Sequence, residues 1–555
     1  MFVKKPQHNA ICNPKLYSEQ KKHLIPSNHF HTEYICKIDI FVFVLILLVA
    51  AIGSFFWVVG QRKSIIVLSI MAIIIIIGLW VWYKSTGDKY PFNFASYRAF
   101  PVAFVILACT FSLFFAPGTV PDEGYHFIQS YKYSNLIIPG MAIGDFRADD
   151  LSFYDDSALF TTSVSRECWS SLIENTQAFS SNTSIISNSD LADATNYAFD
   201  VGANPPQLKL PSALGIALAR LLGLSSILLF YMGRFFNIIF ASILICLAVR
   251  ITPIGRNAMM AAALLPMTLH LVGSYSYDAG IIGISFLFVA MALRAIYRTE
   301  KITIKEISEL LIISALLAPC KVVYTVLIAM LFLIPCRRFP TRRQAAIFKI
   351  TVILVPIAVI LALRIPSLIQ LSGMNADKAG GNHRGDETGS FYTLSYIICH
   401  PTYTVYLCMN TLYTQCDFYL KSLLGGTLGW FQASIATPMT ASLLPLGVLC
   451  LSVLSGAPDD SSVLQGKARA LMGLIVFVCV LLIIVSMMLG WTFDTETVVQ
   501  GVQGRYFLPI LPVFLFALRS KSFQTSLRIG FGLVLIMSAY NLICLANIAA
   551  IMPAA

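Results

Sequence analysis

The chain has 555 residues, of which 57% are hydrophobic and only 12% are charged. Several apolar runs reach about 18 residues, long enough to cross a bilayer as helices, and they lack the short alternating pattern of membrane β-strands. The formal net charge of +11 is typical of cytoplasmic loops rich in Lys and Arg, and we expect no nucleic-acid partner.

The sequence therefore predicts an all-α polytopic membrane protein. Residues 1–38 are polar, contain six lysines and show no signal-peptide core, so we expect a cytoplasmic basic tail. An accessory transmembrane hairpin is expected within 39–97, and the membrane core within 98–555. About 13 transmembrane helices are predicted, at residues 40–59, 64–83, 99–116, 227–249, 257–274, 279–297, 305–319, 321–336, 345–364, 438–455, 469–490, 505–519 and 526–547. The shorter apolar stretch 210–223 predicts a peripheral or re-entrant helix.

Lys and Arg gather in segments that this count places on the same side as the tail. The strongly basic segments are 294–305, 336–343 and 519–528. The positive-inside rule puts them in the cytoplasm and puts two long loops, 117–207 and 365–437, outside. The first of these loops has twelve Asp and Glu against three Lys and Arg. One short basic loop, QRK at 61–63, does not fit this orientation.

Ionisable residues of the core collect near its predicted outer face. Asp122 and Glu123 follow the third span, and His126 lies one turn further on. The other members lie in the outer parts of later spans or at their outer ends: Arg234, His270, Tyr277, Asp278, Lys321 and Arg505. Ionisable groups at membrane depth are costly and are usually functional or paired. Their one-sided distribution predicts a site at the external membrane surface.

The residue types suggest group transfer from a lipid phosphate. Arg234, Lys321 and Arg505 could hold a phosphate, since Arg offers a planar fork of donors and Lys a compact charge. A carboxylate at 122 or 123 could accept the proton of an attacking hydroxyl.

Several motifs give this interpretation a family resemblance. PDEGYHF (121–127) resembles the Asp-Glu-x-x-Tyr/His signature of GT-C glycosyltransferases, multi-pass enzymes that use polyprenyl-phosphate sugars. The chain is more closely similar to a bacterial family of predicted membrane proteins of unassigned function. The segments that carry this similarity are PDEGYHF, ANPPQLKLPSALGIALARLLGLSS (203–226), YMGRFFN (231–237), LLPMTLH (264–270), SYSYDAG (274–280), LLGGTLGW (423–430) and VQGRYFLPILP (502–512).

The GT-C resemblance implies roles for three residues. Asp122 would be the general base that activates an acceptor hydroxyl, with inversion at the anomeric carbon. Glu123 would orient the acceptor or assist the base, and Arg505 would bind the donor phosphate. The acceptor would be a cell-surface glycan or a lipid-linked molecule outside the bacterial plasma membrane. The two spans before Asp122 depart from the usual plan, in which the catalytic loop follows the first span.

Each of these residues also has a structural interpretation. Asp122 and Glu123 could cap a helix, and Arg505 and Lys321 could reach lipid headgroups only. Arg234 could form an ion pair, with Asp278 as one candidate partner. His126 and His270 could be packing groups.

Other ligands and other functions remain open from the sequence. Mg²⁺ or Mn²⁺ could bind Asp122, Glu123 and His126 with Asp278 or Asp386, but the ligand set is not closed, and we expect no obligatory metal. The competing functions are a transporter or flippase of lipid-linked saccharides, a glycan polymerase or ligase, and a structural assembly partner. A transporter would place its charged residues near the membrane midplane.

Overall fold

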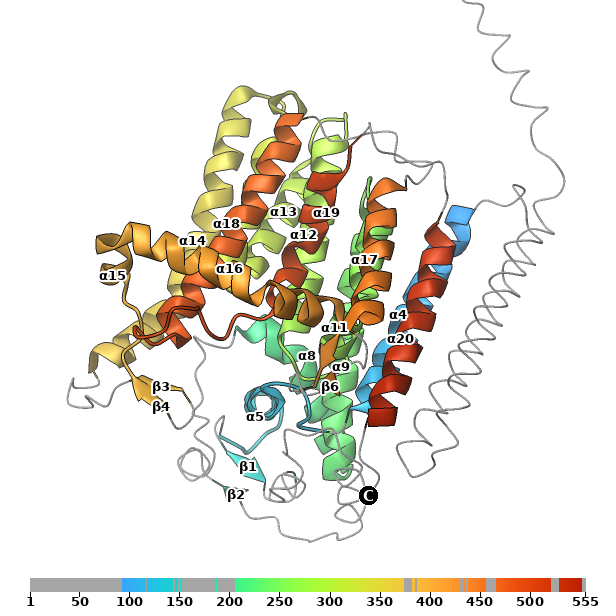
Figure 1. Ribbon diagram of the computed structural model, residues 1–555, viewed down its shortest axis with the longest axis vertical. Helices are drawn as coiled ribbons and strands as arrows, with labels where there is room; N and C mark the ends of the chain where they lie inside the picture. Colours follow the sequence, from blue (N-terminus) through green and yellow to red (C-terminus); the bar gives the residue numbers. More distant parts are fainter. Residues whose placement is uncertain are drawn as a thin grey trace, which may run out of the picture.

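The protein is described by a computed structural model, which is mostly helical (Figure 1). It describes residues 92–115, 117–142, 145–147, 150, 185–186, 205–373, 382–384, 387–429, 433–434, 438–455, 466–520 and 529–551. The tail 1–38, the predicted spans 40–59 and 64–83, and most of the first long loop lie outside the described residues.

Four described helices are long and apolar enough to cross a membrane. They are α9 (Ser226–Ile251), α12 (Asp278–Tyr297), the Arg342–Leu363 part of α14 (Arg342–Gly373), and α18 (Gly466–Trp491). They coincide with the spans predicted at 227–249, 279–297, 345–364 and 469–490. The upright helices lie side by side in one bundle (Figure 1).

Four other predicted spans are helices at the expected positions, although they do not meet the same criterion of length and hydropathy over their described residues. They are α4 (Phe92–Phe114), α13 (Ile304–Leu317), α17 (Pro438–Leu454) and α20 (Gly530–Ile551). The count of thirteen crossings is therefore not confirmed.

Three predicted spans are not continuous α-helices. The span at 257–274 breaks into α10 (Arg256–Ala263) and α11 (Pro266–Val272), because Pro266 has no N–H to continue the helix. The span at 321–336 is the 3₁₀ helix η3 (Val322–Leu333), followed by the single turn η4 (Cys336–Arg338). The span at 505–519 begins as the 3₁₀ helix η5 (Gly504–Ile510) and continues as α19 (Leu511–Leu518).

The two predicted outer loops carry structure of their own. Their helices are α5 (Glu123–Ser134), α15 (Leu394–Cys399) and α16 (Pro401–Leu424). Helix α8 (Pro206–Leu221) begins at the end of the first loop and overlaps the short helix predicted at 210–223. Three antiparallel pairs join β1 (Phe146–Arg147) to β2 (Ile185–Ile186), β3 (Asn382–Arg384) to β4 (Glu387–Gly389), and β5 (Thr427–Leu428) to β6 (Ala433–Ser434). Helix α16 runs across the upright helices, and α5 lies near the lower end of α9 (Figure 1).

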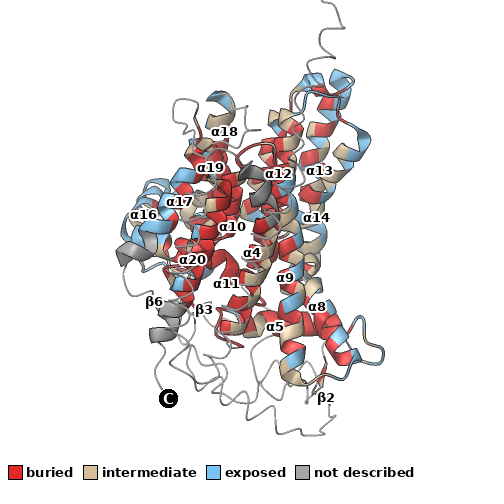
Figure 2. Cartoon of the chain, turned by 90° about the vertical axis from the view of Figure 1, so that its right-hand side faces the viewer, coloured by how far each residue is buried: buried red, intermediate tan, exposed pale blue. Residues whose placement is uncertain are grey.

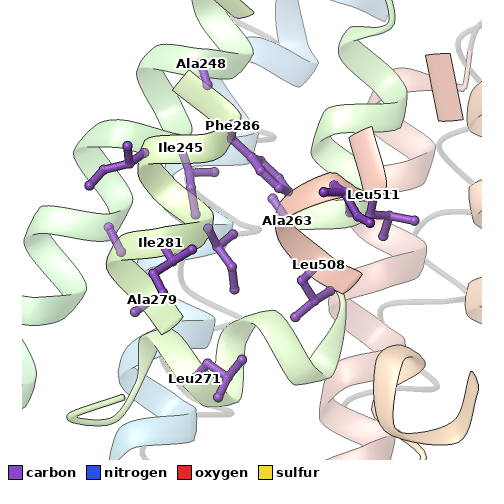
Figure 3. Packing of buried hydrophobic residues seen from close by; sticks show 14 of the residues in the cluster. Ile245, Ala248, Ala263, Leu271, Ala279, Ile281, Phe286, Leu508 and Leu511 are labelled. Atoms are coloured by element: carbon purple, nitrogen blue, oxygen red, sulfur yellow. The ribbon is translucent and has the colours of Figure 1, made fainter. Parts of the chain in front are cut away.

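The core is centred on α12. In its apolar window 83% of the residues are buried, against 17% in α14, so α12 is an interior helix and α14 presents its apolar side chains outward. Figure 2 shows the same contrast, with α10, α11 and α12 almost wholly buried. Ile245 of α9, Phe286 of α12 and Leu511 of α19 belong to one close-packed cluster (Figure 3).

The two ends of α12 differ in chemistry. Asp278 begins the helix, whereas Arg294 lies in its last turn and Arg298 follows it. Beside this basic end the buried guanidinium of Arg338 donates to the carbonyl oxygens of Ala295 and Glu300, at 2.5 and 2.8 Å. A 20-residue helix spans about 30 Å, which matches the hydrocarbon thickness of a bilayer. Asp278 and the basic residues at the other end of α12 therefore lie about a membrane thickness apart.

Candidate functional site

The turn between α4 and α5 gives Asp122 an unusual backbone. Pro117 and Pro121 interrupt the helical pattern, and α5 begins at Glu123. Asp122 has φ 60° and ψ 13°, and among the described residues other than glycine it alone has a positive φ. Asp and Asn tolerate this left-handed region better than most residues, at a cost of order 1 kcal/mol. The side chain of Asp122 makes no capping hydrogen bond to α5, so helix capping does not explain this residue.

Glu123 and Arg234 form a fully buried ion pair. The guanidinium Nε and Nη2 donate to the two oxygens of Glu123 at 2.8 and 2.6 Å, and both side chains are 0% exposed. The backbone N–H groups of Gly118 and Tyr275 also donate to this carboxylate, each at 3.0 Å. The sequence-based suggestion that Arg234 pairs with Asp278 is wrong, because Glu123 is its partner.

Arg234 also forms hydrogen bonds with the C-terminal end of α4. Its Nη1 donates to the carbonyl oxygens of Ser112 and Phe115, at 2.7 and 2.6 Å. These contacts join α4, the turn, α5 and α9 around one guanidinium. Because Glu123 is the next residue in the chain, the ion pair also fixes the backbone at Asp122.

Asp122, Arg505, Asp278 and Lys321 form a continuous chain of ion pairs, which we call the acid–base network. The Nη2 of Arg505 lies 3.2 Å from Oδ2 of Asp122, and its Nε lies 3.7 Å from Oδ2 of Asp278. The Nζ of Lys321 donates to Oδ1 of Asp278 at 2.9 Å. Residues from the α5 turn, α12, the start of η3 and η5 thus meet, as the one-sided distribution in the sequence predicts. Arg505 and Lys321 are engaged inside the protein, so headgroup contact alone does not describe them.

Exposure differs sharply along this network. The side chain of Asp122 is 54% exposed and that of Lys321 is 23% exposed, whereas Arg505 and Asp278 are 4% and 6% exposed. The middle of the network is therefore buried, and its two ends reach the surface. An ion pair in such a place is less screened than one in open water.

Two tyrosine rings alternate with the cations of the site. The Nζ of Lys321 lies 4.8 Å from the ring centroid of Tyr277 and 4.1 Å from that of Tyr506. The guanidinium of Arg505 lies 5.4 Å from the Tyr506 ring. Tyr324 fixes this part of the chain by donating its hydroxyl hydrogen to the carbonyl oxygen of Tyr506 at 2.7 Å. Tyr277 and Tyr506 are both partly exposed residues.

Lys209 belongs to the same region, although the sequence analysis did not select it. Its Nζ lies 2.6 Å from Nδ1 of His126 and 5.4 Å from the Tyr277 ring. The His126 ring contacts that same tyrosine edge-on, with centroids 4.5 Å apart. Lys209 is a lone lysine within the short apolar helix α8, and the rule that an ionisable residue in an apolar helix needs a partner could have identified it.

Burial, and then the nearby Lys209, Arg505 and Lys321 charges, hold the pKa of His126 well below 6.5. In the unfolded chain the imidazole takes up a proton as the pH falls through about 6.5, whereas in the folded protein it stays neutral. The unfolded state then binds more protons, so acidification lowers the free energy of unfolding.

We expect the melting temperature of the protein in detergent to fall between about pH 7 and pH 5 for this reason. His126→Asn, which keeps an acceptor for Lys209, should make that fall shallower. His400→Asn, at an exposed position, should keep the wild-type profile. Identical pH profiles for the two variants would contradict a neutral, buried His126.

The remaining predicted residue, His270, has Phe115 and Gly429 as its described ring and hydrogen-bond contacts. Its ring packs on Phe115 with centroids 4.3 Å apart, and its Nε2 accepts from the N–H of Gly429 at 3.3 Å. Within the described residues no three His, Cys, Asp or Glu side chains form a group that could hold a metal ion. Asp386, one of the possible ligands, lies outside those residues.

Comparison with known proteins places the chain in a family. No curated protein and no solved structure matches it. The family model described as "Predicted membrane protein (DUF2142)" matches residues 104–514, which is more than half of the chain and includes every residue of the acid–base network. Apolar helices of bilayer length agree with that description. The chain therefore belongs to the DUF2142 family of membrane proteins.

Proposed function

We propose that the protein is an inverting glycosyltransferase of the GT-C type. It moves a sugar from a polyprenyl-phosphate donor to a hydroxyl of a cell-surface glycan or a lipid-linked acceptor, outside the bacterial plasma membrane. One observation carries this proposal: the half-exposed carboxylate of Asp122 is joined through Arg505 and Asp278 to Lys321. A carboxylate that could act as a base and cations that could bind a phosphate therefore lie in one network.

The proposed reaction assigns one role to each end of the network. Asp122 accepts the proton of the acceptor hydroxyl, whose oxygen forms a bond to the anomeric carbon. The bond from that carbon to the phosphate oxygen breaks with its electron pair, and polyprenyl phosphate leaves. Arg505 and Lys321 bind the phosphate as its negative charge grows. Tyr277 and Tyr506, two partly exposed residues beside these cations, carry rings on which a sugar ring could stack.

The position of the site agrees with a reaction outside the membrane. Asp278 begins α12, and Arg294 and Arg298 lie at its other end beside the basic segment at 336–343. If the basic end is cytoplasmic, as the positive-inside rule requires, the acid–base network lies on the outer side. A clustering of these residues at the end of α12, away from its middle, favours an enzyme over a transporter with a midplane site.

The direct test is a transfer assay with the full-length protein in liposomes. Polyprenyl-phosphate sugars serve as donors, and the linkage of the product shows whether the anomeric configuration is inverted. Runs with EDTA and with Mg²⁺ or Mn²⁺ test the expectation that no metal is obligatory. Lack of transfer from every polyprenyl-phosphate sugar, in protein that is folded and inserted, would reject the proposal.

Binding experiments should distinguish the proposed phosphate-binding residue Arg505 from the proposed base Asp122. We expect Arg505→Ala to weaken donor binding by roughly 10- to 100-fold, because a buried charged hydrogen bond contributes about 1.5–3 kcal/mol. Arg337→Ala, at an exposed position near the basic end of the bundle, should bind the donor normally. Donor binding by fluorescence-detected titration gives the answer, and an unchanged dissociation constant for Arg505→Ala would exclude it from the phosphate site.

A further inference from the structure

Lys209 is a buried cation without an acidic partner. Its residue exposure is 1%, and Nδ1 of His126 is the acceptor that its ammonium group contacts, at 2.6 Å. An ammonium group has three N–H donors. Among the described residues no carboxylate lies within ion-pair distance of Lys209, although the nearby Lys321 and Arg505 each have one or two. Two of the three N–H groups of the buried Lys209 ammonium therefore have no oxygen or nitrogen acceptor among the described residues.

Such a charge is costly unless a negative group compensates it. Burial holds the pKa of Lys209 well below 10.5, and the more distant Asp278 and Asp122 oppose this only in part. His126 is a neutral acceptor, because its own pKa is lowered. The surroundings of Lys209 thus supply one hydrogen bond and no adjacent negative charge.

Lys209 also adjoins the cations of the acid–base network. Lys209 and Lys321 both lie against the ring of Tyr277, at 5.4 and 4.8 Å from its centroid. The region holds three cationic side chains, Lys209, Lys321 and Arg505, but two carboxylates, Asp122 and Asp278. When Lys209 is protonated, the region has one more positive than negative charge. The excess charge lies on Lys209, because Lys321 and Arg505 have carboxylate partners.

We propose that Lys209 is a phosphate-binding residue, whose ammonium group donates to a non-bridging oxygen of a phosphate ester that Lys321 and Arg505 contact from the other side of the site. His126 is a positioning residue, which fixes the ammonium group through Nδ1. The proposal rests on the proposed function for the location of the donor. It deepens that function by adding a buried subsite for the leaving phosphate, separate from the exposed carboxylate of Asp122.

The test measures anion binding without sugar or acceptor. The full-length protein in detergent is titrated with polyprenyl phosphate, with inorganic phosphate and with phosphatidylglycerol, and binding is followed by the shift in melting temperature. Lys209→Met should weaken binding of polyprenyl phosphate by tenfold or more. Lys305→Met, whose side chain is 86% exposed, should bind as the wild type does.

The same titrations identify the source of the phosphate. A Lys209-dependent shift with polyprenyl phosphate and none with phosphatidylglycerol supports the donor lipid. A shift with phosphatidylglycerol alone assigns the subsite to a membrane headgroup and overturns the proposal. Without ligand, Lys209→Met should be at least as stable as the wild type, since it removes an uncompensated buried charge. Equal polyprenyl phosphate affinity in Lys209→Met and the wild type also overturns the proposal.

A pH profile separates anion binding from a packing role. The affinity of the wild type should decline as the pH rises from neutrality toward the usual lysine pKa of about 10.4, because burial makes Lys209 lose its proton at a lower pH than an ordinary lysine. Over this range a phosphate monoester is already a dianion. Burial raises the pKa of Tyr277 to about 12, and Lys321 keeps its proton beside Asp278.

Lys209→Arg should remove this decline, since a guanidinium stays charged. The charged groups near Lys209 are Asp122, Asp278, Lys321 and Arg505, and these are retained in this variant together with the neutral His126. The same decline in Lys209→Arg as in the wild type would show that another group is responsible. The binding titration contains no sugar, so it is independent of the transfer assay. Lys209-dependent binding of polyprenyl phosphate, combined with no transfer in the liposome assay, would reject the glycosyltransferase but keep the phosphate subsite.

Discussion

Asp122→Asn is expected to lower kcat for sugar transfer by about 10²- to 10⁴-fold, the usual contribution of a positioned general base. Donor affinity should change little, because Arg505 keeps its contact with Asp278. The replacement is nearly isosteric, and Asn tolerates the left-handed backbone that residue 122 adopts, with φ 60°. The variant therefore removes the proposed base while leaving the turn intact.

Two further variants sharpen this experiment. Asp122→Gly also suits a positive φ, so it should fold at least as well as the wild type and be equally inactive. Asp417→Asn alters a carboxylate that is 77% exposed and paired with Lys421, and it should leave transfer unchanged. Transfer at the wild-type rate by Asp122→Asn would remove the base assignment. Parallel losses of donor binding and turnover would instead show that Asp122 and Arg505 do not divide the work as proposed.

Glu123→Gln should lower the free energy of unfolding by about 3–5 kcal/mol, the typical effect of removing one partner from a buried ion pair. The variant leaves the guanidinium of Arg234 fully buried without a counter-charge. It also weakens the carboxylate hydrogen bonds from the N–H groups of Gly118 and Tyr275. SDS titration of the protein in mixed micelles measures this change.

A double-mutant cycle distinguishes an ion-pair effect from a general packing defect. The double variant Glu123→Gln/Arg234→Met removes both charges, so its loss of stability should be clearly smaller than the sum of the two single losses. Glu309→Gln, in a solvent-exposed pair with Lys305, should change stability by less than about 0.5 kcal/mol. Strict additivity of Glu123→Gln and Arg234→Met would contradict the coupling that the structure describes.

The length of the apolar runs predicted the long helices well, because an apolar segment of about 20 residues can satisfy its backbone hydrogen bonds in a bilayer only as a helix. It failed where local chemistry interrupts an apolar run. Pro266 was visible inside LLPMTLH, and its missing N–H splits the predicted span into α10 and α11. The 3₁₀ geometry of Val322–Leu333 has no comparable signal, since nothing in VVYTVLIAMLFL distinguishes it from an α-helix.

The sequence predicted the residues of the acid–base network but not how the ionised residues pair. Positive-inside counting placed Asp122, Asp278, Lys321 and Arg505 at one end of the core, and they meet in one network. It could not tell which acid faces Arg234, because three acidic residues share that end and only the packing of α4 on α9 selects Glu123. Lys209 was missed because the short helix was predicted to begin at residue 210, whereas α8 begins at Pro206 and includes the lysine.

The Glu123–Arg234 pair has a consequence for biogenesis. Arg234 lies about 12 Å along α9 from its first residue, and an arginine deep in an inserting helix costs about 2.5–3.5 kcal/mol. The ribosome makes Glu123 111 residues earlier than Arg234, so the counter-charge and the carbonyl groups of Ser112 and Phe115 are already at the membrane when α9 arrives. The order of synthesis thus provides the acceptors first and the arginine second, and we expect packing of α9 against α4 to neutralise the charge of Arg234 during insertion.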